Sequence, residues 1–232
     1  MGSLSGPAAT ALPYWQVNVP TDRRTDECPE GLRNLSAKDV GILSTPDGAY
    51  RRQTWTEVRR LVETNRLDLF QRVPSELRRY RLFIHFLTKE YGSVMNFVLR
   101  RRLGWEEEGQ LGATEGKGLF EEEADYRILY NDWPYGIDGR IVHLVVWTKF
   151  ELEENPATGD LTERARGEID QFVEGTFRAR TKADTVIWFK NWRSLKSVHA
   201  VEHFHIMLFD PDPAFIREIT NGDVPQCEKF EA

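Results

Sequence analysis

One stretch near the end of the chain, residues 197–207, constrains the fold more than any other, because three of the five histidines lie in it. In a β-strand successive side chains point to opposite faces, so His199, His203 and His205 would share one face. Imidazole titrates near neutral pH, which suits phosphorus chemistry, proton transfer or metal binding better than simple packing. The pattern therefore predicts a functional site on one face of a strand.

The C-terminal half reads as strand, strand, helix, strand, strand. Residues 142–147 form an apolar run that is typical of a strand covered on both faces. Ala165, Ile169 and Phe172 recur at helical spacing. We expect strands at 126–130, 141–150, 185–189 and 199–209, a helix over 161–177 and a short closing helix at 214–219. The predicted fold class is α+β, with a mixed or antiparallel sheet crossed by one long helix.

Helical signals dominate the N-terminal half. Thr54 or Thr56 is placed to cap a first helix, Pro74 opens a second, and Gly92 is placed to stop it. Residues 93–103 predict a third, short helix. We divide the chain into a flexible N-terminal arm at 1–25, a helical N-terminal extension at 26–104, an acidic Gly-rich loop at 105–124 and the α+β domain at 125–232.

Composition narrows the class of protein. A chain of 232 residues that is 40% hydrophobic can bury one substantial core. The net charge of −6 argues against a general nucleic-acid binder, which needs clustered Lys and Arg to neutralise phosphates. Cys28 and Cys227 form no Cys-x-x-Cys pair, and the sequence contains neither an apolar run long enough to span a bilayer nor a secretion signal. We expect a protein of the cytoplasm or nucleus, without a membrane partner.

Two segments together resemble the histidine-triad superfamily of nucleotide hydrolases and transferases. One is Asp132-x-Pro134 followed by His-Leu-Val-Val-Trp-Thr-Lys at 143–149, and the other is the alternating stretch at 197–207. A full triad would require histidine at Val201 or Met207, and neither is present. The resemblance leaves two assignments open. Either His203 attacks and His205 binds phosphate, or His205 attacks.

A second resemblance covers most of the chain. The strings Leu-Pro-Tyr-Trp at 12–15, Tyr-Gly-Ser-Val-Met-Asn-Phe-Val-Leu at 91–99, Tyr-Asn-Asp-Trp-Pro-Tyr-Gly at 130–136 and the long run at 188–205 are similar to the fungal N-acetylglucosamine-induced protein family. This resemblance implies a fungal cytoplasmic protein connected with aminosugar or UDP-sugar metabolism. It implies no settled chemical activity.

From the residues and the superfamily resemblance we predict a metal-independent nucleotidyl hydrolase or transferase that acts at the α-phosphate of a nucleotide or nucleotide sugar, with UDP-N-acetylglucosamine as the first candidate and no cofactor. A homodimer is compatible with the sequence. The predicted catalytic residues are His203 and His205, the predicted nucleotide-binding residues are Lys190, Asn191, Arg193, Lys196, Ser197, His143, Asn131 and Asp132, and His199 is a further candidate.

Other functions fit the same residues. The His-x-His pair with His199, His143 or Asp210 as third ligand could hold zinc, iron or manganese. The protein could also be a non-catalytic sensor that binds a nucleotide sugar in a pocket and does not convert it. Individual candidate residues could instead have structural roles. Cationic side chains in loops are often solvated, and Asn-Asp pairs often cap turns.

Overall fold

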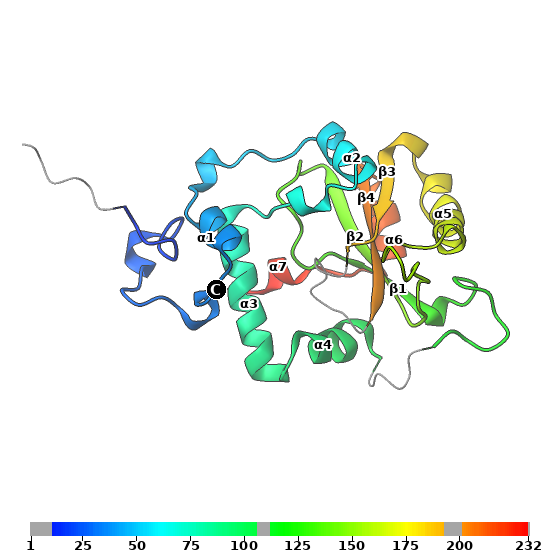
Figure 1. Ribbon diagram of the computed structural model, residues 1–232, viewed down its shortest axis with the longest axis horizontal. Coiled ribbons are helices and arrows are strands. Elements are labelled where there is room, and N and C mark those ends of the chain that lie inside the picture. Colours follow the sequence, from blue (N-terminus) through cyan, green and yellow to red (C-terminus); the bar gives the residue numbers. More distant parts are fainter. Residues whose placement is uncertain (1–10, 106–111, 193–200, 232) are drawn as a thin grey trace, which may run out of the picture.

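The computed structural model describes residues 11–105, 112–192 and 201–231, which form an α+β fold (Figure 1). Four strands make a sheet of order β1-β2-β4-β3, and every neighbouring pair is antiparallel. The strands are β1 (Tyr126–Tyr130), β2 (Ile141–Thr148), β3 (Val186–Phe189) and β4 (Glu202–Phe209). The sheet is thus the antiparallel one of the two predicted forms.

Helices precede, cross and follow the sheet. Those before it are α1 (Ala37–Leu43), α2 (Trp55–Glu63), α3 (Pro74–Tyr91), α4 (Val94–Phe97) and a π-helical segment (Val98–Leu103); those after β2 are α5 (Glu163–Thr176), α6 (Pro213–Ile219) and α7 (Gln226–Lys229). The predicted signals act as expected. Thr54 caps α2 in a reciprocal capping box with Glu57, and Gly92 ends α3 with a φ of +76°. The third predicted helix is divided into α4 and the π-helical segment.

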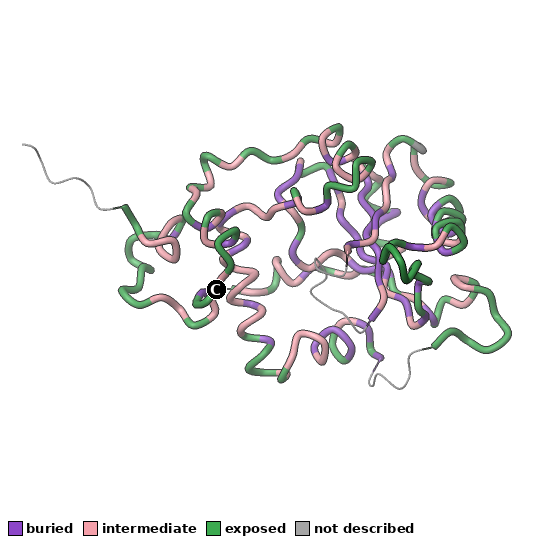
Figure 2. Tube along the Cα trace, in the orientation of Figure 1, coloured by how far each residue is buried: buried purple, intermediate pink, exposed green. Residues whose placement is uncertain are grey.

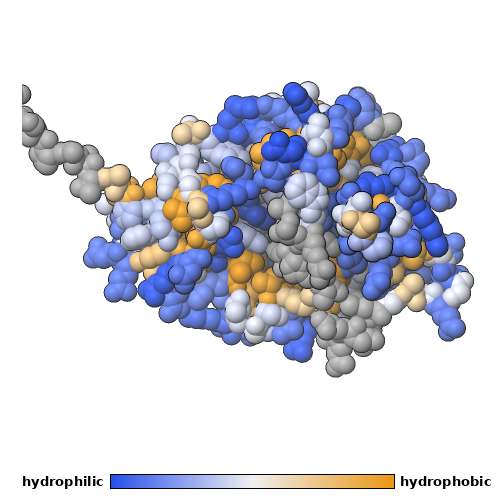
Figure 3. Space-filling view, viewed as in Figure 1, coloured by the Kyte–Doolittle hydropathy of each residue, from blue (hydrophilic) through white to orange (hydrophobic). Residues whose placement is uncertain are grey.

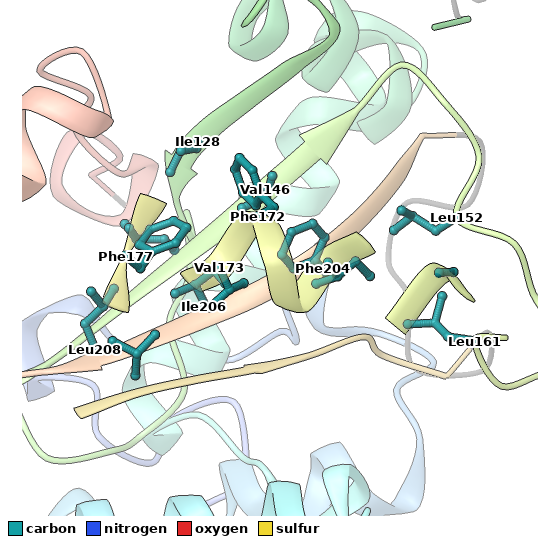
Figure 4. Close-up of a cluster of buried hydrophobic side chains, with 14 of the residues drawn as sticks. Ile128, Val146, Leu152, Leu161, Phe172, Val173, Phe177, Phe204, Ile206 and Leu208 are labelled. Carbon is teal, nitrogen blue, oxygen red and sulfur yellow. The ribbon is translucent and has the colours of Figure 1, made fainter. Parts of the chain in front are cut away.

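One face of the sheet is covered by α5 and α6 (Figure 1). Alternate residues of β4 point to this face, and Phe204, Ile206 and Leu208 are fully buried there. They pack with Ile169 and Val173 of α5, and Figure 4 shows the α5 side chains lying across the strands. The helical spacing in the sequence therefore corresponds to a helix that buries one side on the sheet.

The opposite face of the sheet carries the histidines and is covered by the helices of the N-terminal half (Figures 1 and 2). Phe83 of α3 shares a buried cluster with Leu129 of β1, and Val58 of α2 shares another with Met207 of β4. Buried residues, purple in Figure 2, occur on both sides of the predicted boundary between extension and domain, and two clusters combine residues from the two sides. That boundary stays a prediction, but the cores on either side of it are shared.

Candidate functional site

A pocket of about 380 Å³ lies between the histidine face of the sheet and the N-terminal helices. On the face drawn in Figure 3 the surface is mostly hydrophilic, and hydrophobic side chains show between these helices and the sheet. The volume falls in the range of small-molecule sites, about 300 to 1,000 Å³. The lining that matters for chemistry comprises Arg72, Arg81, Asn131, Asp132, Trp133, Tyr135, Trp147, Asn191, His203 and His205.

Strand register links the imidazoles of His143 and His205. In the β2–β4 ladder His143 lies opposite Met207, so His205 is its diagonal neighbour on the same face. Asn191 Nδ2 donates to His205 Nε2 at 2.9 Å, and this leaves the hydrogen of a neutral His205 on Nδ1. His205 Nδ1 then donates to His143 Nε2 at 3.0 Å. Both ring nitrogens of His205 are therefore held by protein groups.

His143 itself is only 3% exposed. Burial, reinforced by the charge of Arg72, lowers the pKa of His143 to about 3, so this imidazole is neutral at physiological pH. The amide nitrogen of Asn131 lies 3.3 Å from His143 Nδ1 and 3.2 Å from Nε2. An atom so nearly equidistant from both nitrogens sits over the ring and not along either lone pair. The predicted nucleotide-binding residue His143 thus packs beneath the pocket and orients His205.

His203 has a different environment. Its Nδ1 donates to the carbonyl oxygen of Val201 at 2.9 Å, which leaves the lone pair of the neutral ring on Nε2. Its ring lies against Trp147 of β2, with centroids 4.4 Å apart. The backbone and one indole ring thus hold both the tautomer and the tilt of His203.

Arg72 is one of the residues of this pocket that the sequence did not reveal. Its Nε donates to the carbonyl oxygen of Trp133 at 2.9 Å, and its guanidinium lies 4.0 Å from the ring centroid of Tyr80 and 5.6 Å from that of Tyr135. Among the described residues no carboxylate forms an ion pair with it. No motif surrounds Arg72, and the only signal available in the sequence was the aromatic turn at 133–135 that it contacts.

Asp132 has a structural task. Arg102 contacts it at 2.8 Å and contacts Asp223 at 2.7 Å, and the backbone nitrogen of Gln226 donates to it at 3.1 Å. Burial raises the pKa of Asp132 even though Arg102 opposes the shift. Its oxygens therefore connect the turn after β1 to the C-terminal segment. Its neighbour Asn131 accepts a hydrogen bond from the backbone nitrogen of Trp133 at 3.0 Å, as a turn cap does.

The predicted phosphate-binding loop is only partly within the described residues. Lys190 forms ion pairs with Glu154 at 2.5 Å and Glu202 at 2.8 Å, and it borders a neighbouring groove instead of the pocket. Asn191 of this loop lines the pocket, whereas Arg193, Lys196 and Ser197, together with the further candidate His199, lie outside the described residues. Across the part of the chain that is described, no group of three His, Cys, Asp or Glu side chains is placed to hold a metal ion.

A family model with the description "Protein of unknown function (DUF3605)" matches residues 54–209. The chain belongs to this family. The match begins at the cap of α2 and ends with the last residue of β4, so the DUF3605 unit contains both the helical wall and the sheet wall of the pocket.

Two curated proteins and one solved structure are similar to this DUF3605 chain. N-acetylglucosamine-induced protein 1 of Candida albicans is 29% identical over 185 residues, 73% of each chain. Uncharacterized protein YPL067C of Saccharomyces cerevisiae is 28% identical over 167 residues, 71% of this chain and 82% of that protein. The crystal structure of HTC1 has the same fold, with a TM-score of 0.61 and 24% identity over 75% of this chain and 98% of that chain.

The predicted resemblance to the N-acetylglucosamine-induced family is confirmed by these matches. The histidine-triad likeness of the sheet, the cytoplasmic or nuclear location and the homodimer stay predictions. Within the described ranges, none of the helices has the length and apolar character needed to cross a bilayer.

Proposed function

We propose that this DUF3605 protein transfers or hydrolyses a nucleotidyl group, with His203 as the nucleophile. His203 Nε2 forms a bond to the α-phosphorus, the bond from phosphorus to the leaving-group oxygen breaks, and the leaving group departs with the electron pair. Water or a second phosphate oxygen then forms a bond to the phosphorus, the phosphorus–nitrogen bond breaks with its electron pair returning to Nε2, and the proton of an attacking water passes to the solvent. The observation that carries the proposal is the 2.9 Å hydrogen bond from His203 Nδ1 to the carbonyl oxygen of Val201, because it directs the lone pair to Nε2 in a ligand-sized pocket.

His205 is poorly placed to be the attacking residue. Attack requires an in-plane lone pair, whereas the Nδ1 of His205 is bonded to His143 and its Nε2 to Asn191. His205 is better placed to hold neighbouring groups in position. Of the two assignments that the sequence left open, we therefore adopt the first.

The donors around the pocket support an acceptor-rich, anionic ligand. Arg72 brings a guanidinium that forms no ion pair with the described carboxylates. Two buried donors of the lining, Trp133 Nε1 and Arg81 Nε, have no acceptor among the described residues. Buried donors left without acceptors are uncommon in folded proteins, and a phosphate or base carbonyl would supply the missing oxygens.

The test is chromatographic detection of UMP when EDTA-treated protein is incubated with UDP-N-acetylglucosamine. His203→Asn keeps a donor for Val201 but has no nucleophilic nitrogen, so we expect its rate to fall at least about a thousandfold. The intact mass of the wild type should show a uridylyl adduct that the variant lacks. His85→Ala is the matched control, because His85 lies on α3 against Glu30 and does not line the pocket.

A His203→Asn variant with full rate and adduct would remove His203 from the mechanism. If the wild type binds the nucleotide sugar and forms neither UMP nor adduct, the pocket is that of a nucleotide-sugar sensor.

A further inference from the structure

A second hollow, a groove of about 300 Å³, lies beside the pocket on the outer side of β3. Its lining includes Asn65, Asp160, Arg166, Trp188, Lys190 and Trp192. The groove and the pocket have two residues in common, Leu67 and Asn191. A ligand with two parts could therefore occupy both hollows and pass Asn191 on the way.

The two tryptophans of the groove have their polar atoms already engaged. Trp188 Nε1 donates to Asp170 at 2.7 Å, and Trp192 Nε1 donates to Asn65 at 2.9 Å. Both residues are half-buried, so what they offer a ligand is ring surface and no further donor. An aromatic face carries negative potential, which attracts weakly positive C–H groups.

The charged side chains of the groove are of both signs. Glu63, Glu154 and Asp160 are acidic, whereas Arg166 and Lys190 are basic. Lys190 is already paired with Glu154 and with Glu202 of β4. An anion would meet carboxylates here and a cation would meet Arg166, so the mixture suits a neutral ligand that both donates and accepts hydrogen bonds.

Asn191 is the observation that points directly to a ligand. The residue is 7% exposed, and its Nδ2 is bound to His205. Its Oδ1 is buried without a hydrogen-bond partner among the described residues. A buried carbonyl oxygen without a donor destabilises the fold, and a ligand hydroxyl or amide N–H at the junction would satisfy it.

We propose that this groove is a subsite for a neutral polyhydroxylated ring, a hexose or N-acylated hexosamine unit. Its C–H face packs on Trp188 and Trp192, its hydroxyls meet Asp160 and Arg166, and one donor reaches Asn191 Oδ1. The subsite is inferred from the groove itself. Only the idea that the bound ring is linked to a nucleotide in the pocket rests on the function proposed above.

The test observes the indole N–H signals of the seven tryptophans in 15N-labelled full-length protein, assigned by Trp→Phe substitutions. D-glucose and N-acetyl-D-glucosamine, each titrated to about 10 mM, should shift the signals of Trp188 and Trp192 but not those of Trp133 and Trp147. UMP is the separate probe of the pocket and should shift the latter two. No shift at Trp188 and Trp192 with either hexose, or equal shifts at all tryptophans, overturns the subsite.

Variants at the groove sharpen the result. Asp160→Asn, on an exposed loop, should weaken hexose binding at least fivefold, and Trp192→Leu at least tenfold. Glu163→Gln is the matched control, since Glu163 is exposed on the neighbouring helix outside the groove. Equal affinity in Asp160→Asn, Trp192→Leu and the control would contradict the proposal. Hexose shifts without UMP formation from UDP-N-acetylglucosamine and without UMP binding would leave the subsite standing and reject the proposed function alone.

Discussion

Single residues show how the surroundings of an imidazole decide what it can do. His143 and His203 lie on adjacent strands of one sheet and are both buried, yet only His203 borders the pocket. Burial keeps His143 neutral, and a backbone carbonyl selects the tautomer of His203. Their neighbours thus give the two histidines different roles. His143 holds another side chain in place, and His203 is positioned for chemistry.

The lowered pKa of His143 makes stability depend on pH. The folded value is about 3, against roughly 6.5 for an unperturbed histidine, so between these values the unfolded chain binds one more proton. This contribution to stability is complete above pH 6.5 and is lost as the pH falls, by about 1.4 kcal/mol per pH unit. In His143→Gln, we expect urea unfolding between pH 7.5 and 5 to show a correspondingly shallower decline.

The comparison is between slopes and not absolute stabilities, because the substitution also removes the hydrogen bond to His205. His85→Gln is the control for replacing a half-buried histidine outside this cluster. Parallel curves for wild type and His143→Gln would show that His143 does not carry the acid sensitivity.

The sequence predicted part of this site and could not predict the rest. Alternation along one strand was sufficient to place His203 and His205 on a common face, because strand periodicity is local. It could not show that Arg72 would join them, since that contact depends on how the loop before α3 lies over the turn at 133–135. Nor could it show that Lys190 would form ion pairs with Glu154 and Glu202.

At the scale of elements, the turn between β1 and β2 positions much of the pocket wall. It presents Trp133 and Tyr135, and the chain before α2 is tied to it. Tyr50 Oη donates to the carbonyl oxygen of Gly136 at 3.1 Å, and the backbone nitrogen of Gln53 donates to the same oxygen at 3.2 Å. The turn therefore joins the helical wall to the sheet wall.

Gly136 is required there by a close approach. A Cβ at this position would lie 2.3 Å from Tyr50 Oη, so Gly136→Ala must displace the tyrosine and should destabilise the protein by about 1 to 3 kcal/mol. Gly139→Ala, in the same connection, meets nothing within 4 Å and should change stability by less than about 0.5 kcal/mol. Urea unfolding measures both. Equal stabilities would show that Tyr50 moves aside freely.

The elements themselves were largely predictable, because capping, glycine stops and apolar periodicity are local signals. Pro74 and Gly92 bound α3 as expected. The π-helical turns after α4 were not predicted, since residues 98–103 keep an ordinary helical pattern and their backbone geometry depends on packing against the sheet.

At the scale of the whole molecule, the helical and sheet parts depend on each other. Two of the buried clusters are shared, because they join α2 and α3 to the sheet. The two walls of the pocket are therefore expected to unfold together, and a ligand between them would stabilise both.

The buried ionic cluster at Arg102 holds the C-terminal segment to these walls. The Arg102 and Asp223 side chains are each 8% exposed, and Arg102 joins Asp223 to Asp132. Arg102→Met leaves the buried carboxylate of Asp223 and the partly buried one of Asp132 without a cation, so we expect a loss of about 3 to 5 kcal/mol in the free energy of unfolding. Arg101→Met, at an exposed neighbouring position, should change it by less than about 0.5 kcal/mol.

Urea unfolding of the full chain at pH 7 gives both values, and Asp223→Asn provides a milder disruption of the same cluster if Arg102→Met does not fold. The result also decides the role of Asp132. If the cluster is structural, Asp223→Asn lowers stability and leaves UMP affinity unchanged at temperatures where the protein is folded. If Asp132 instead contacts the ligand, Asp223→Asn changes the UMP affinity and has little effect on stability. That result would show that the structural assignment of Asp132 is wrong.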